Sequence, residues 1–128
     1  MPLKVEILRR EPTGNVVMLE GSLDSNTYQQ FEKATEPLMT SGTSLIVLDL
    51  AKLSYVSSAG LRVIFRIWKN AAAAKYRFGM VNLQPQVKTV FDIMQALPKE
   101  GVFSSLEELD TYLDLIQKQE AGKQKKAT

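Results

Sequence analysis

The feature that most constrains the fold is a continuous apolar run, Leu45 to Leu48, followed directly by Asp49. A run of this length is typical of a strand buried on both faces, as in a parallel sheet covered by helices. Further along the chain, one helical face gathers the apolar residues Leu61, Ile64, Phe65, Trp68, Ala71 and Ala72. The opposite face carries Arg62, Arg66, Lys69 and Asn70, which we read as solvated. A buried strand followed by an amphipathic helix predicts an α/β domain, with Trp68 in its core.

The residues before this unit predict an antiparallel hairpin over residues 3–20. Apolar and polar residues alternate from Leu3 to Ile7, as in a half-buried strand. Pro12 to Asn15 has turn chemistry, and Val16 to Leu19 forms the second strand, which Gly21 ends.

A helix is expected next. Asp24, Ser25 or Asn26 can cap it, because each side chain offers an oxygen to the unpaired N–H groups of a first turn. Its buried stripe is Phe31, Ala34, Thr35 and Leu38. Pro37 predicts a kink or a fresh start there, with termination near residues 41–42.

The second half of the chain predicts one more strand and two more helices. The strand covers Phe78 to Leu83, and Pro85 opens a helix whose buried stripe is Val87, Val90, Phe91 and Met94. Val102-Phe103 is a candidate edge strand. Capping-box spacing at Ser104/Glu107 and Ser105/Glu108 opens a final helix, with the stripe Leu106, Leu109, Leu113 and Ile116.

The fold prediction is therefore a single α/β domain over residues 1–117, with a mixed sheet of four to five strands and about four helices. Residues 118–128 form a basic, flexible C-terminal tail in this interpretation. Lys118, Lys123, Lys125 and Lys126 against Glu120 give the last twelve residues a local charge of +3, so the remainder of this +2 chain is close to neutral. We interpret the tail as solvated, not as a nucleic-acid contact.

The composition argues against catalysis. The chain has neither cysteine nor histidine, so it lacks the imidazole or thiolate on which many nucleophilic and zinc sites depend. It also lacks a phosphate-binding glycine loop. We expect no enzyme activity, no metal and no cofactor. No targeting segment or apolar stretch of roughly 20 residues is visible, which predicts a cytoplasmic protein without stable membrane insertion.

The segment from Asp49 to Arg62 carries the functional prediction. It joins the buried strand to the amphipathic helix, and its two serines, Ser57 and Ser58, stand where that helix begins. A hydroxyl there lies beside N–H groups and the positive end of the helix dipole, which favour an anion. Two interpretations remain open: a serine that only caps the helix, and a serine that is modified. Gly60 is likewise either a packing glycine or a recognition feature.

The order of elements over residues 3–117 resembles a STAS domain, the family of bacterial anti-sigma factor antagonists and sulfate-transporter tails. The matching pieces are residues 21–24, residues 45–50 and, most specifically, Tyr55 to Arg62. The last is similar to the family signature of a hydrophobic residue, Asp, Ser, Ser/Thr, Gly and Leu. The resemblance places Ser58 on the phosphorylated serine, with Ser57 as an alternative acceptor where many members have aspartate. Ala59 stands where they have a second hydroxyl.

The resemblance implies a partner switch. The unmodified antagonist binds an anti-sigma factor that is also a serine kinase, and phosphorylation breaks the complex. A metal-dependent serine phosphatase restores it. The implied partner surface is Asp24, Ser57, Ser58, Ala59, Gly60 and Arg62. Asp24 as a helix cap is an equal alternative. Other readings are a STAS regulator of a non-sigma partner and a STAS subunit of a membrane lipid or anion transport system.

Overall fold

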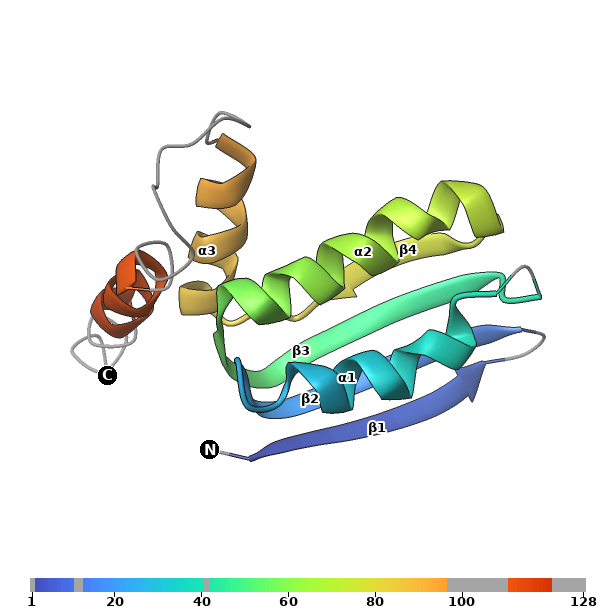
Figure 1. The fold of residues 1–128 in the computed structure, drawn as a ribbon, viewed down its shortest axis with the longest axis horizontal. Helices are drawn as coiled ribbons and strands as arrows, with labels where there is room; N and C mark the ends of the chain where they lie inside the picture. The colour runs from blue at the N-terminus through green and yellow to red at the C-terminus, as the bar shows by residue number, and fades with distance from the viewer. Residues whose placement is uncertain (1, 11–12, 41, 97–110, 121–128) are drawn as a thin grey trace.

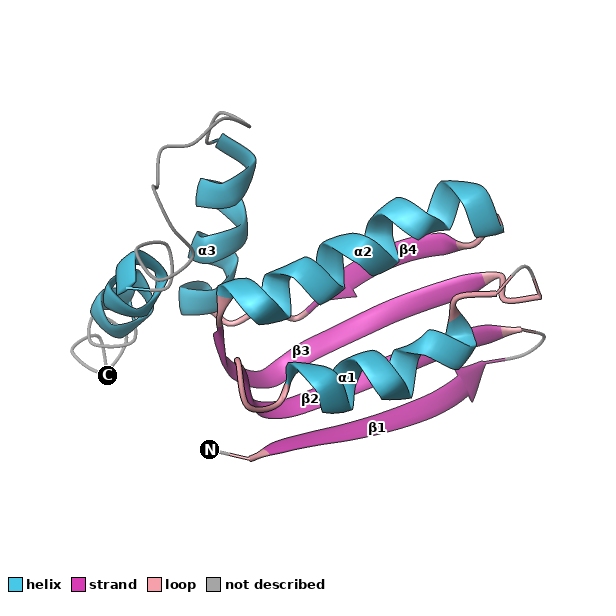
Figure 2. Ribbon diagram, viewed as in Figure 1, coloured by secondary structure: helices cyan, strands magenta, loops and turns pink. Residues whose placement is uncertain are grey.

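The computed structural model describes residues 2–10, 13–40, 42–96 and 111–120. Its centre is a sheet of four strands, β1 (Leu3–Arg10), β2 (Gly14–Leu23), β3 (Leu45–Val56) and β4 (Arg77–Val81). The strands lie in the order β1-β2-β3-β4, with β1 and β2 antiparallel and the other two pairs parallel (Figure 2). The predicted α/β class and mixed sheet are confirmed.

The helices cover one face and one end of this sheet. They are α1 (Tyr28–Thr35), the 3₁₀ turn η1 (Glu36–Leu38), α2 (Ser58–Ala74) and α3 (Pro85–Ala96), and residues 111–120 are also helical. Helices α1 and α2 lie side by side across the sheet, whereas α3 and the helix of residues 111–120 stand where β3 leads into α2 (Figure 1). The junction between β3 and α2 is therefore surrounded by elements from both halves of the chain.

On β3, buried and partly exposed side chains alternate from one residue to the next over Leu45 to Leu50. Ile46, Leu48 and Leu50 are fully buried beneath the helices, while Leu45 and Val47 alternate with them and are only partly buried. The prediction that this strand is buried on both faces is therefore wrong. Successive side chains point to opposite faces, and only one face of the sheet lies under α1 and α2.

Two predicted boundaries in the first part of the chain are also wrong. Gly21 does not end β2; its φ of +107° lets the strand pass Pro2, whose carbonyl oxygen would lie 2.1 Å from a Cβ at this position. None of the three suggested residues caps α1, because the helix begins later and Thr27 is its N-cap. The fresh start predicted at Pro37 is confirmed, since η1 begins at Glu36 and has the proline in its first turn. The helical segment ends at Leu38, before the predicted end near residues 41–42.

Trp68 is not part of the core, which corrects the prediction from helical spacing. Trp68 is 43% exposed, whereas its neighbour Ile67 is fully buried. The buried face of α2 is rotated toward Ile64 and Ile67, which leaves Trp68 at the edge of the sheet. There its ring stacks on Phe78 of β4, with centroids 6.1 Å apart.

The C-terminal predictions are tested only in part. Val102-Phe103, both capping boxes and the start of the last stripe lie outside the described residues. Leu113 is fully buried, as predicted, and the helix runs through residue 120. Lys118, expected in the tail, is helical and pairs with Asp114 at 3.0 Å. Within the described ranges, no helix has the length and apolarity needed to cross a membrane.

The alternation on the sheet generates a stability prediction. Leu48→Ala is expected to lower the free energy of unfolding by about 2–5 kcal/mol, because it leaves a cavity beneath the helices. Leu8→Ala is the matched control, since Leu8 of β1 is 48% exposed and its truncation should cost less than about 1 kcal/mol. Urea denaturation measures both; equal losses would contradict the assignment of the buried face.

Candidate functional site

The serines of the candidate site occupy distinct positions at the start of α2. Ser57 is the N-cap, with an extended backbone and a side-chain oxygen that accepts from the Gly60 N–H at 3.5 Å. Its own N–H donates to the Leu23 carbonyl at 2.9 Å, and its carbonyl accepts from the Leu61 N–H at 2.9 Å. Ser58 is the first residue of the helix. Ser57 therefore caps the helix, and Ser58 belongs to the first turn of the helix itself.

Gly60 has a packing role, which was one of the two interpretations that the sequence left open. A Cβ at this position would lie 2.6 Å from the Leu23 side chain and 3.0 Å from the Leu23 carbonyl oxygen. The first turn of α2 thus rests directly against the end of β2. This close approach brings the Leu23 carbonyl within reach of the Ser57 N–H and so holds the serines in place.

Both serines are enclosed. Ser57 is 5% exposed and Ser58 is 4% exposed, and the next residue, Ala59, is 8% exposed. Residues this enclosed present very little surface to a bulky reagent or an enzyme in this conformation. Access to either oxygen requires the segment to open, which makes the contacts that hold it part of the site.

Asp24 lies beside this junction in a turn of its own. Its carboxylate accepts from the Asn26 N–H at 2.9 Å and from the Thr27 hydroxyl at 3.2 Å. Its carbonyl also accepts from the Tyr28 N–H, at 2.9 Å. Because Asp24 follows Leu23 directly, the structure brings this predicted partner residue to the same end of the sheet as the serines, partly exposed.

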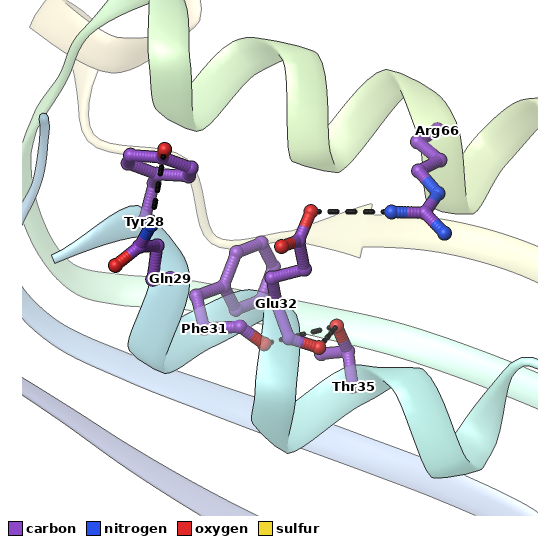
Figure 3. Close-up of polar contacts among 6 residues, drawn as sticks. All are labelled: Tyr28, Gln29, Phe31, Glu32, Thr35 and Arg66. Atoms are coloured by element: carbon purple, nitrogen blue, oxygen red, sulfur yellow. Dashed lines mark hydrogen bonds and ion pairs between the residues drawn. The ribbon is translucent and has the colours of Figure 1, made fainter.

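A shallow groove of about 210 Å³ runs between α1 and α2 next to the serines. Its lining comes from Tyr28 and Glu32 of α1 and from Ala59, Arg62, Val63 and Arg66 of α2. Arg66 crosses it to pair with Glu32 at 3.1 Å (Figure 3). Arg62 is exposed and, in the part of the chain that the structure describes, forms no ion pair, so its charge is available to a bound group.

Sequence reasoning missed one residue of the site, Gln117, which it placed at the boundary of the tail. Gln117 is 2% exposed. Its amide Nε2 donates to the Val56 carbonyl and its Oε1 accepts from the Val56 N–H, both at 2.8 Å. Val56 directly precedes Ser57. The only signal in the sequence was the spacing of Gln117 four residues after Leu113, on the apolar stripe of that helix.

The groups at the start of α2 are suited to hydrogen bonding and to contact with charged groups. Among the described residues, no three His, Cys, Asp or Glu side chains are grouped so that they could hold a metal ion. The first turn of α2 contains no acidic residue, so the helix dipole is not offset there. The site combines a helix terminus, two hydroxyls, a carboxylate and Arg62, which forms no ion pair within the described ranges.

Comparison with known proteins identifies the family. The STAS domain family matches residues 6–109, and the chain belongs to it. BtrV of Bordetella bronchiseptica, named as an anti-sigma factor antagonist, is 33% identical over 78 residues, which is 61% of this chain and 67% of BtrV.

Solved structures share the fold. An anti-sigma factor antagonist from Mycobacterium paratuberculosis has a TM-score of 0.63 at 18% identity, covering 88% of this chain and 94% of that one. The Bacillus cell fate determinant SpoIIAA in its phosphorylated form has a TM-score of 0.61 at 20% identity, covering 71% and 83%. Its unphosphorylated form also has a TM-score of 0.61, at 19% identity and with 70% and 83% covered.

The contact at Gly60 generates a second stability prediction. Gly60→Ala is expected to lower the free energy of unfolding by about 1–3 kcal/mol, because the added methyl displaces Leu23. Gly79→Ala is the matched control, since a Cβ there meets nothing within 4 Å and should not destabilise the domain. Thermal and urea denaturation of both variants provide the measurement. A neutral Gly60→Ala would show that α2 does not rest on β2 as described.

Proposed function

We propose that this protein is an anti-sigma factor antagonist whose partner binding is switched by phosphorylation of Ser58. The observation that carries the proposal is the position of Ser58 as the first residue of α2, within the segment that resembles the family signature. Support comes from the relatives: BtrV is named as an antagonist, and SpoIIAA has been solved in both phosphorylated and unphosphorylated forms. In this proposal the chain is a cytoplasmic regulator and a kinase substrate, not an enzyme.

The partners follow from the same proposal. Unmodified, the chain binds an anti-sigma factor that is also a serine kinase; phosphorylated, it is released, and a metal-dependent serine phosphatase returns it to the binding form. The binding surface comprises Asp24 and Arg62 together with the first turn of α2, whose enclosed serines are reached when their segment opens. These residues lie beside the groove between α1 and α2.

The physical effect of the phosphate is local. It adds about −1.5 to −2 charges at neutral pH. At the N-terminus of a helix such a charge typically gains about 0.3–1 kcal/mol, and the first turn of α2 has no carboxylate to repel it. Arg62 lies four residues further along the helix, within the reach of a charge-assisted hydrogen bond. The domain therefore accommodates the charge, whereas a partner packed against this surface meets both bulk and negative charge.

Phosphorylation is tested by incubating the protein with candidate anti-sigma kinases from the same genome, with ATP and magnesium. The expected result is one added phosphate by intact mass, mapped to Ser58 and absent from Ser58→Ala. Ser57→Ala is the control and should still be modified. Phosphate mapped only to Ser57, or no phosphate from any of these kinases, would contradict the proposal.

Partner binding is tested with a variant that mimics the charge. Ser58→Asp is expected to remain folded and to bind the anti-sigma partner on the order of a hundredfold more weakly, because an unmatched interface charge costs several kcal/mol. Ser58→Asn is the matched control of the same size without the charge, and it should bind more tightly than Ser58→Asp. Circular dichroism checks folding and calorimetry measures affinity. Loss of secondary structure in Ser58→Asp would mean that the switch acts by unfolding.

A further inference from the structure

In the last part of β3, which still pairs with β2, glutamine side chains take the place of β4 as hydrogen-bond partners of the backbone. Pairing between β3 and β4 ends at Asp49 and Val81. Beyond that point, Gln84 donates to the Ala51 carbonyl at 2.8 Å and Gln86 donates to the Ser54 carbonyl at 3.3 Å. Gln117 completes the series at Val56, where it both donates and accepts.

Gln117 is the one of these three glutamines that bonds both the N–H and the carbonyl of the same β3 residue. Its Nε2 also donates to the Leu113 carbonyl at 3.1 Å, so both Nε2 hydrogens and Oε1 have partners. The orientation of the amide is determined by chemistry, because the Val56 N–H needs an acceptor and the Val56 carbonyl needs a donor. A buried carboxamide held in this way ties the helix of residues 111–120 to the backbone one residue before the N-cap Ser57.

We propose that Gln117 is a positioning residue. It holds residues 56–58, which we call the serine segment, in their enclosed position and thereby sets how often the Ser58 hydroxyl becomes accessible. Two observations carry this inference. Ser57 and Ser58 are 5% and 4% exposed, so modification requires opening. The segment is anchored on one side by the Ser57 N–H to the Leu23 carbonyl and on the other by the Gln117 pair at Val56. We call the pair of hydrogen bonds between Gln117 and Val56 the latch. Its regulatory role rests on the proposed function.

The latch couples two distant parts of the chain. Gln117 and Val56 are 61 residues apart in the sequence. Because an equilibrium coupling acts in both directions, any event that loosens the helix of residues 111–120 raises the accessible fraction of Ser58.

A unique thiol measures the opening without any kinase. The chain has no cysteine, so Ser58→Cys introduces a single reporter of nearly the same size. Its rate of reaction with a dithiodipyridine reagent reports how often the segment opens. Adding Gln117→Leu removes both hydrogen bonds to Val56 while keeping an apolar volume, and it should accelerate labelling about tenfold or more. Gln119→Leu is the matched control, because Gln119 is exposed on the same helix and should leave the rate unchanged.

Global unfolding is separated from local opening by the urea dependence of labelling. Local opening exposes little surface, so the rate should rise only slightly with urea below the unfolding transition. A steep dependence equal to that of global unfolding, or no acceleration in Gln117→Leu, would overturn the latch.

A conservative variant gives a readout that a merely structural role would not move. Gln117→Glu keeps the shape and can accept from the Val56 N–H, but an ionised carboxylate cannot donate to the Val56 carbonyl. Protonation restores one donor. The labelling rate of Gln117→Glu relative to the Gln117 parent should therefore be high at neutral pH and fall toward one as the pH is lowered. A ratio independent of pH would contradict the donor role of Gln117.

The kinase reaction distinguishes this inference from the proposed function. In the chain with Ser58 intact, Gln117→Leu should raise the initial rate of phosphorylation at Ser58, and Gln119→Leu should not. Equal phosphorylation rates in the parent and Gln117→Leu, with equal thiol labelling, would overturn the latch and leave the proposed function standing. Faster labelling with no phosphate at Ser58 in any variant would support the latch and overturn the proposed function.

Discussion

The close approach of α2 to the end of β2 is the constraint on which the site depends. Gly60 leaves room for Leu23 where any larger residue would collide with it, and the Leu23 carbonyl then accepts from the Ser57 N–H at 2.9 Å. This contact joins the N-terminal hairpin to the first turn of the longest helix described. It determines that Ser57 caps the helix and that Ser58 lies enclosed beside it.

The chemistry of the site follows from where the strands end. β3 continues past its last pairing with β4, so its backbone groups on that side need other partners, above all at the buried Val56. Gln84, Gln86 and Gln117 supply them from elements far along the chain. The same hydrogen bonds that satisfy the Val56 backbone therefore link the helix of residues 111–120 to the segment that carries Ser58.

Local pattern predicted the elements well where one chemical preference dominated. The hairpin, the break at Pro37, the start of α3 at Pro85 and the mixed α/β sheet were all visible in the sequence. Prediction failed where tertiary packing, and not the local sequence pattern, determines which face of a helix or strand is buried. Helical spacing could not show that α2 turns Ile67 inward and leaves Trp68 on Phe78 at the edge. Strand spacing could not show that only one face of β3 is covered.

The sequence by itself determined the class of fold, the STAS resemblance and the position of two serines at a helix start, because these depend on periodicity and on the chemistry of neighbouring residues. Only the tertiary structure decided which serine caps the helix, that both are enclosed, and that Gln117 holds Val56. The reason is physical: the neighbours of Gln117 in the sequence do not reveal its role, which depends on the backbone of Val56, 61 residues away, that folding alone brings within 2.8 Å.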